Sequence, residues 1–307
     1  MDGGLSPIQA AGLFTALAAK GESIDEIAGA ARAMRDRSLH VRHDLPVVAD
    51  IVGTGGDGAD TINISTMSAL VVAAAGVPVA KHGNRAASSA CGSADVLEAA
   101  GLELDVPPER AAEALARTGF AFLFAPRYHP AMKYVAPVRR ELGVRTIFNV
   151  LGPLTNPAGA THQVVGVARP ELLEPVGAVL RELGTQAGAV VHGPGGIDEI
   201  GGDGVTQVAS FDADGPRRWT LDPAEFGVRA SRADIAGGSL RACSDAFQAI
   251  LAGEDSPRAD VVALNAALAL HLCGTATMRE AYEQARAVQR SGKALLTFLA
   301  ARSASNG

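Results

Sequence analysis

The strongest constraint on the fold is an alternation of short apolar runs with alanine-rich helical segments through the middle of the chain. The runs are rich in β-branched and aromatic residues, whereas the segments between them have the apolar spacing of helices. This alternation indicates βαβ units and an α/β fold, in which helices flank a large and mostly parallel sheet. The expected strands are 47–52, 77–80, 120–124 and 187–191, and the expected helices are 67–75, 94–100, 108–118 and 170–183.

Both ends of the chain are predicted to be helical. A capping serine followed by proline opens a helix over 8–20, and a capping-box pattern opens a second helix that ends near Arg37. The stretch 129–143 is again helical, and from Ser244 onward the chain is mostly helical. We therefore expect a small α-helical domain over residues 1–45, completed by about 129–147, and a large α/β domain over 46–128 and 148–307.

Composition argues against several classes of function. The formal net charge is −6, so nothing attracts the whole chain to nucleic acid or to an anionic membrane. No uncharged apolar run is long enough to cross a membrane, and the N-terminus lacks the pattern of a signal peptide. Cys91, Cys243 and Cys273 form no disulfide or zinc pattern, which indicates reduced thiols and a cytoplasmic location. An anionic ligand would need a local basic pocket or a metal ion.

A glycine-rich loop, VGTGGDGADTINIST over residues 52–66, follows the first predicted strand. A P-loop would need lysine and a hydroxyl residue where Ala59 and Asp60 stand, and an acidic residue there would repel phosphates. The loop also matches the G-x-G-x-x-G of dinucleotide-binding proteins, which requires a helix that opens inside the motif. Helical character resumes only at Met67, so this match lacks its structural context.

Two interpretations of this loop remain open. One is a plain glycine turn with Ser65 or Thr66 as an ordinary N-cap. The other is a phosphate site of a different type, in which backbone N–H groups and hydroxyls bind the anion and Asp57 shares a cation with it. A second loop, KHGNRAASSACGS over 81–93, favours the phosphate site because it too follows a strand and carries cations and hydroxyls. Two such loops at the carboxyl edge of a sheet would form one pocket.

A third loop, HGPGGIDE over residues 192–199, carries adjacent carboxylates after a predicted strand. Asp198 and Glu199 fit a Mg²⁺ ion, which prefers a few carboxylates together with phosphate oxygens. Taken alone, the pair is equally typical of a solvated acidic turn. The two phosphate-type loops make the metal site the better interpretation.

Long strings of this sequence resemble the anthranilate phosphoribosyltransferase family. They are DIVGTGGDGADTINIST, KHGNRAASSACGSADVLEAAG, FLFAPRYHPAMKYVAPVRRELGVRTIFNVLGPLTNPAG and VVHGPGGIDEI, and they stand in the family's order. The resemblance implies the fold of the class II nucleoside phosphorylases, with a small all-α domain beside a large α/β domain, and a homodimer through the small domain. It further implies transfer of phosphoribose from phosphoribosyl pyrophosphate (PRPP) to the amine of anthranilate in tryptophan biosynthesis, with two Mg²⁺ ions per site.

The resemblance also implies the site residues. The PRPP contacts would be Gly53, Gly56, Asp57, Thr61, Asn63, Ile64, Ser65, Thr66, Lys81, His82, Gly83, Asn84, Arg85, Ala86, Ala87, Ser88, Ser89 and Ser93. The anthranilate contacts would be Gly53, Asn84, Arg139 and His129. Ser65 would help hold one Mg²⁺, and Asp198 with Glu199 the other.

Each implied role suits the chemistry of its residue. Arg139 offers a charge-assisted partner for the carboxylate of anthranilate. The aromatic amine is already neutral at pH 7, so positioning of the reactants and neutralisation of pyrophosphate are the main tasks. No acid–base dyad is evident; His82 and His129 are the candidates for proton transfer, and a binding or structural role ranks ahead for each.

The chain departs from the family pattern in a few places. It begins at the Gly-x-Leu-Ser-Pro segment, and if that start is natural, the shorter helical domain would weaken the dimer. Cys91 stands where serine is usual, in the second glycine loop. Three other functions remain open: a paralogue acting on another aromatic amine, a pyrimidine-nucleoside phosphorylase, and a non-catalytic paralogue that binds a ligand or nucleic acid.

Overall fold

A seven-stranded sheet forms the centre of a computed structural model that describes residues 3–86, 90–274 and 277–307. Its strands are β1 (Ala49–Gly53), β2 (Val79–Gly83), β3 (Phe120–Phe124), β4 (His162–Gly166), β5 (Ala187–His192), β6 (Thr206–Asp212) and β7 (Gly215–Leu221). Their order in the sheet is β3-β2-β1-β4-β5-β6-β7. The pairs from β3 to β5 are parallel and the last two are antiparallel, so the predicted fold class is confirmed.

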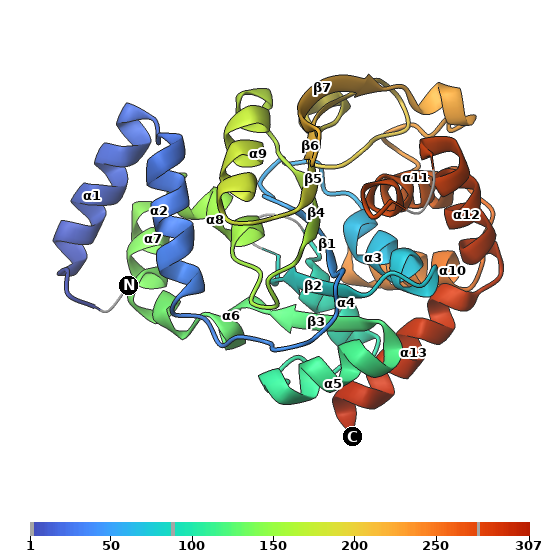
Figure 1. The fold of residues 1–307 in the computed structure, drawn as a ribbon, viewed down its shortest axis with the longest axis horizontal. Coiled ribbons are helices and arrows are strands. Elements are labelled where there is room, and N and C mark those ends of the chain that lie inside the picture. Colours follow the sequence, from blue (N-terminus) through green and yellow to red (C-terminus); the bar gives the residue numbers. More distant parts are fainter. Residues whose placement is uncertain (1–2, 87–89, 275–276) are drawn as a thin grey trace.

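Helices cover both faces of the sheet (Figure 1). They are α1 (Pro7–Lys20), α2 (Ile24–Arg35), α3 (Ile64–Ala74), α4 (Ser93–Ala99), α5 (Pro108–Thr118), α6 (Ala125–Tyr128), α7 (Ala136–Leu142), α8 (Phe148–Leu154), α9 (Leu173–Glu182), α10 (Leu240–Leu251), α11 (Pro257–Leu272), α12 (Met278–Arg290) and α13 (Lys293–Asn306). The 3₁₀ turns are η1 (Pro130–Tyr134), η2 (Pro170–Leu172), η3 (Pro194–Gly196) and η4 (Pro223–Phe226). No helix in the described ranges is both long and apolar enough to cross a membrane.

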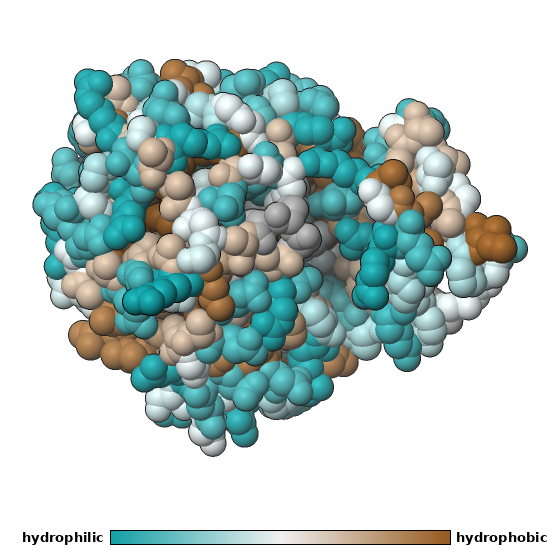
Figure 2. Space-filling model, turned by 180° about the vertical axis from the view of Figure 1, so that it is seen from behind, coloured by the Kyte–Doolittle hydropathy of each residue, from teal (hydrophilic) through white to brown (hydrophobic). Residues whose placement is uncertain are grey.

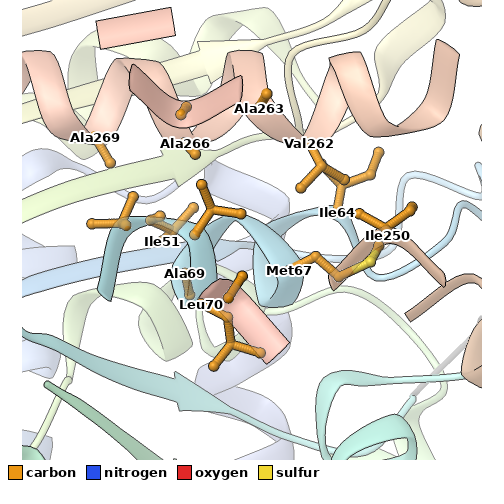
Figure 3. Close-up of a cluster of buried hydrophobic side chains, with 14 of the residues drawn as sticks. Ile51, Ile64, Met67, Ala69, Leu70, Ile250, Val262, Ala263, Ala266 and Ala269 are labelled. Carbon is orange, nitrogen blue, oxygen red and sulfur yellow. The ribbon is translucent and has the colours of Figure 1, made fainter. Parts of the chain in front are cut away.

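Helix α3 is the centre of the largest apolar core. Nearly all of its side chains are buried, including Met67 and Leu70, and it has no polar face. Ala263 and Ala266 of α11 belong to the same cluster as Ile51 of β1 (Figure 3). A helix that is apolar on all sides must be buried. The chain therefore places α3 between the sheet and the C-terminal helices α10 to α13.

A second core joins the helical lobe, which consists of α1, α2, η1 and α7, to the opposite face of the sheet. Phe14 of α1 meets Phe148 of α8 edge to face, with the ring centroids 5.0 Å apart. Helix α2 has the predicted capping box, in which Ser23 and Glu26 each accept a backbone hydrogen bond from the other. Buried residues of α2, α8 and α9 belong to this second core, so apolar packing holds the lobe against α8 and α9.

Most predicted elements are confirmed, and α5 and β3 have the predicted bounds. Two predictions are corrected. The helix expected from Met67 begins at Ile64, which is fully buried, so tertiary packing outweighs the low helix propensity of this segment. The stretch 129–143 is divided into η1 and α7 near Val135, because Pro137 lacks an N–H group and suits only the first turn of a new helix. Strands β4, β6 and β7 and helix α8 were not predicted.

The strand order reverses at β1, because the chain places β2 and β3 on one side of it and β4 and β5 on the other. The ends of β1 and β4 pair in register at Gly53 and Gly166, and Thr54 donates its N–H to the Gly166 carbonyl at 2.9 Å. The backbone of Asp198 crosses this point so closely that a Cβ on Gly166 would lie 1.5 Å from its carbonyl oxygen. Open α/β sheets bind ligands at such reversals of strand order.

The close crossing predicts that Gly166→Ala destabilises the protein. The added methyl group must push the Asp198 backbone away, so we expect the free energy of unfolding to fall by about 1–3 kcal/mol in chemical denaturation. Gly29→Ala in α2 is the matched control, because nothing lies within 4 Å of its Cβ position. That control is expected to gain up to about 1 kcal/mol. Equal denaturation midpoints for Gly166→Ala and the unmodified protein would contradict the close crossing.

Candidate active site

The first glycine loop closes directly on the acidic loop that follows β5. The N–H of Gly55 donates to Asp198 Oδ2 at 2.6 Å, and the N–H of Asp198 donates to Asp57 Oδ2 at 3.4 Å. A Cβ on Gly53 would lie 2.2 Å from the same Asp198 oxygen. Glycine is therefore required at the end of β1, because the carboxylate rests against the backbone.

The side chain of Glu199, from the same acidic loop, reaches the N-terminus of α3 at the far end of the first glycine loop. Its Oε1 accepts the N–H of Ser65 at 3.0 Å, and its Oε2 accepts the hydroxyl of Thr61 at 3.4 Å. The free N–H groups of a helix N-terminus favour a negative charge. Asn63, expected to contact the ligand, donates its amide to the Cys91 carbonyl at 3.1 Å, which ties the two glycine loops together.

The two acidic side chains carry negative charge that the protein compensates poorly. Burial, followed by the charge of Asp57, raises the pKa of Asp198 to about 6. Burial, followed by the charge of Asp198, raises the pKa of Glu199 well above its usual value. Carboxylates held this close resist ionisation without a cation. The pair therefore fits a divalent cation, although no set of three or more His, Cys, Asp or Glu side chains in the described ranges forms a metal cage.

Lys81 of β2 is the cation that faces this pair. Its side chain is 1% exposed, and its ammonium donates to the Ile51 carbonyl at 2.6 Å and to Ser65 Oγ at 3.3 Å. Burial lowers the pKa of Lys81 to about 8, against the opposing charges of Asp50, Glu199 and Asp198. A pKa of about 8 still favours the charged ammonium at pH 7.

A fully buried carboxylate connects β1, β2 and the segment after α8. Asp50 accepts the N–H of His82 at 3.3 Å and the amide of Asn156 at 2.8 Å, and Asn156 also donates to the Ala80 carbonyl at 2.7 Å. Burial raises the pKa of Asp50 to about 6, while the charge of Lys81 opposes the shift. This network fixes the strand ends that carry the second glycine loop.

His82 and His129 form a buried imidazole pair, with their Nε2 atoms 3.1 Å apart. His82 Nδ1 lies 3.1 Å from the Gly152 carbonyl, which favours a proton on that nitrogen. Burial lowers the pKa of His82 to about 3 and that of His129 to about 4. Neutral, hydrogen-bonded imidazoles favour a binding or structural role over proton uptake at neutral pH.

The second glycine loop is held mainly by α4. Arg85 forms ion pairs with Asp95 at 3.0 Å and with Glu98 at 2.7 Å. Its guanidinium is therefore bound to α4 and not to Asp198 or Glu199. The N–H of Ala86 donates to Asp95 Oδ2 at 3.0 Å. Ser93 at the start of α4 accepts a hydrogen bond from Thr66 at 3.0 Å. The predicted ligands outside the described residues are Ala87, Ser88 and Ser89.

The remaining predicted ligands are placed as follows. Gly83 ends β2 with its Cα facing Phe122, and the Asn84 side chain accepts the N–H of Arg85 at 2.7 Å. Arg139 lies on α7 of the helical lobe, half-buried, with its guanidinium carbon 5.5 Å from the ring of Phe148. The structure thus brings the first glycine loop, Lys81 and the acidic pair together, and it leaves Arg139 on the neighbouring lobe.

Three residues at this edge were not predicted. Asp50 and Asn156 form the buried network, and Arg145 donates a hydrogen bond to the Gly56 carbonyl. A signal for Asp50 was present in the sequence, since a carboxylate inside an apolar strand run must have a partner when buried. No spacing rule connects Asn156 or Arg145 to the glycine loop, because both contacts are long-range.

Comparisons with known proteins identify the family of the chain. The family model of the glycosyl transferase family a/b domain matches residues 45–295, and that of the glycosyl transferase family helical bundle domain matches residues 1–38. An anthranilate phosphoribosyltransferase from Moorella thermoacetica is 50% identical over 296 residues, which cover 96% of this chain and 87% of that protein. One from Pelotomaculum thermopropionicum is 53% identical over 277 residues, or 90% of this chain and 80% of that protein.

Solved structures give the same result. The anthranilate phosphoribosyltransferase of Thermus thermophilus superposes with a TM-score of 0.94 at 47% identity, over 99% of this chain and 92% of that chain. The Saccharomyces cerevisiae enzyme in complex with PRPP and Mg superposes with a TM-score of 0.89 at 29% identity, over 98% of this chain and 85% of that chain. The chain therefore belongs to the anthranilate phosphoribosyltransferases, within the glycosyl transferase family whose a/b and helical bundle domains it contains.

Proposed function

We propose that this protein transfers the phosphoribosyl group of PRPP to the amine of anthranilate, a step of tryptophan biosynthesis. The bond from ribose C1 to the amine nitrogen forms as the bond from C1 to the pyrophosphate oxygen breaks. Pyrophosphate leaves with the electron pair, and the amine loses a proton to solvent, giving N-(5-phosphoribosyl)anthranilate. The observation that carries this proposal is the acidic pair enclosed by the first glycine loop and faced by Lys81.

The residues of the chain position the reactants. The ends of β1 and β2, with the N-terminus of α3, present backbone N–H groups and hydroxyls to the pyrophosphate of PRPP. Lys81 supplies a fixed positive charge where negative charge develops on the leaving group. Arg139 on the lobe would orient the anthranilate carboxylate, so that the acceptor lies between the lobe and the sheet. The residues carried over from the family resemblance are our proposed ligand set.

Mg²⁺ is the proposed cofactor, and we propose two ions per site. Asp198 and Glu199 would hold one ion and Ser65 would contribute to the other, with remaining ligands from substrate oxygens. When bound, the metal supplies stabilisation of the negative charge on pyrophosphate. The raised pKa of both carboxyls supports the assignment, because a cation relieves the cost of two neighbouring negative charges.

We also propose the domain division expected above and a homodimer through the helical lobe. The lobe projects from the body and shows hydrophobic side chains on its outer surface (Figure 2). On and beside α1, Leu5 is 51% exposed, Ile8 84% and Leu13 47%. Apolar side chains exposed together in this way are typical of an interface. The proposed compartment is the cytoplasm, since the cysteines of the chain are free thiols.

The reaction is tested directly by the fluorescence of anthranilate. We expect the purified protein to consume anthranilate when PRPP and Mg²⁺ are both present, and to lose this activity when EDTA removes the metal. Turnover with another aromatic amine but not with anthranilate would instead support the amine paralogue. Binding of PRPP without turnover of any amine would support a non-catalytic protein.

The acidic pair is tested by Asp198→Asn combined with Glu199→Gln. We expect Mg²⁺-dependent activity to fall by at least about a hundredfold. The metal-free variant should be at least as stable as the unmodified protein at pH 8, since a carboxyl whose pKa is raised by folding costs stability when ionised. This gain should fade as the pH falls through about 6, where Asp198 becomes protonated.

Thermal melts at pH 8 and pH 5 measure that difference. Asp203→Asn is the matched control, because this carboxylate is exposed in the same loop. An acidic-pair variant with unchanged activity and metal dependence would remove Asp198 and Glu199 from the metal site.

The dimer is tested by light scattering at micromolar concentration. We expect a dimer for the unmodified protein and a monomer for Ile8→Lys, because a lysine on the apolar surface of α1 leaves an unpaired charge inside the interface. Leu296→Lys is the control, since that leucine is 65% exposed and its helix α13 lies far from α1 (Figure 1). A monomeric unmodified protein, or equal masses for both variants, would refute the lobe interface.

A further inference from the structure

Arg145 lies on the short connection between the helical lobe and the large sheet, after α7 and before α8. The connection is fixed where it enters α8, because Asn149 Oδ1 accepts the N–H of Thr146 at 3.0 Å. Thr146 is 5% exposed, whereas Arg145 is exposed. This hydrogen bond holds the backbone next to Arg145 in place.

The guanidinium of Arg145 reaches the first glycine loop and donates a hydrogen bond to the Gly56 carbonyl. Gly55 and Gly56 both have positive φ, 67° and 72°, so the loop makes a tight turn here that few other residues could adopt. A Cβ on Gly56 would lie 3.2 Å from Arg145 Nη2. Within the described ranges, no ion pair joins Arg145 to a carboxylate, so its hydrogen bond to the loop has no such competitor.

This contact sets the orientation of the donors in the loop. A peptide unit is planar and trans, so its carbonyl and the following N–H point in opposite directions. With the Gly56 carbonyl held toward Arg145, the N–H of Asp57 faces away from the arginine. The preceding turn directs the N–H of Gly55 to Asp198 at 2.6 Å. Two contacts thus hold the turn over Asp198 and Glu199: Arg145 on the Gly56 carbonyl and Asp198 on the Gly55 N–H.

We propose that Arg145 is a positioning residue for the diphosphate-bearing substrate: it holds the first glycine loop in its binding conformation through the Gly56 carbonyl. This proposal rests on the proposed function, since it concerns the same site. It also links the lobe to the loop, because Arg145 belongs to the connection that leaves the lobe. A cavity of about 290 Å³ borders Arg145 and Gly55 on one side and Gly21 and Glu22 of the lobe on the other.

The test compares Arg145→Gln and Arg145→Lys with Arg140→Gln, an exposed arginine on α7 that loses the same charge. The probe is pyrophosphate with Mg²⁺, measured by calorimetry, so the result does not depend on turnover. We expect Arg145→Gln to weaken this binding, and to raise the KM for PRPP, by about tenfold or more. Arg145→Lys should recover most of the loss, since an ammonium can still donate to the carbonyl, and Arg140→Gln should stay within about twofold.

Two further measurements separate positioning from simple destabilisation. Arg145→Ala should regain pyrophosphate affinity when guanidinium ion is added at millimolar concentration, because the cavity beside the loop is open to solvent. Arg139→Gln should raise the KM for anthranilate and leave that for PRPP nearly unchanged, whereas Arg145→Gln should do the reverse.

Equal pyrophosphate affinity in Arg145→Gln and the unmodified protein would overturn the proposal. Loss of affinity without recovery by lysine or guanidinium would also overturn it. If the unmodified protein binds pyrophosphate with Mg²⁺ but does not consume anthranilate, the proposed function fails while the role of Arg145 is still measured.

Discussion

The buried ammonium of Lys81 is the interaction on which the site depends. It touches the backbone of β1 and the first turn of α3, and its charge opposes the negative charges of Asp50, Asp198 and Glu199. Burial lowers the pKa of this lysine to about 8, and the charges of the three carboxylates oppose that shift. Burial, followed by the charge of neighbouring carboxylates, raises the pKa of Asp198 and Glu199, and a divalent cation would relieve that repulsion.

Close backbone packing fixes where these charges lie. The ends of β1 and β4 pair in register, and the acidic loop after β5 crosses them at distances that exclude any Cβ. Because the crossing occurs where the strand order reverses, the loops of three strands meet at one edge. The buried helix α3 also contributes, because its apolar packing holds its N-terminus next to the first glycine loop.

Much of the fold could be predicted from local patterns, because α5, β3 and the capped helices of the lobe follow periodicity and end signals. The central strand β4 could not, since its sequence HQVVG begins with two polar residues, and Gln163 is buried only because the Pro153 carbonyl and the Thr185 hydroxyl bond its amide. The start of α3 was also misplaced, because Ile64 is helical through burial rather than propensity. The glycine loops and the acidic pair were predicted from their residue types, whereas the contacts of Asp50 and Arg145 were not.

The sequence by itself determined the α/β class, the family, and the residues that carry charge and backbone donors at the strand ends. Those properties are local, since they follow from periodicity, glycine content and the order of motifs along the chain. Only the tertiary structure decided that Arg85 pairs with α4, that Asp198 rests on Gly53, and that Arg145 reaches Gly56. These contacts join residues that are far apart in the sequence and are brought together by strand register and helix packing. Local sequence patterns specify neither of these.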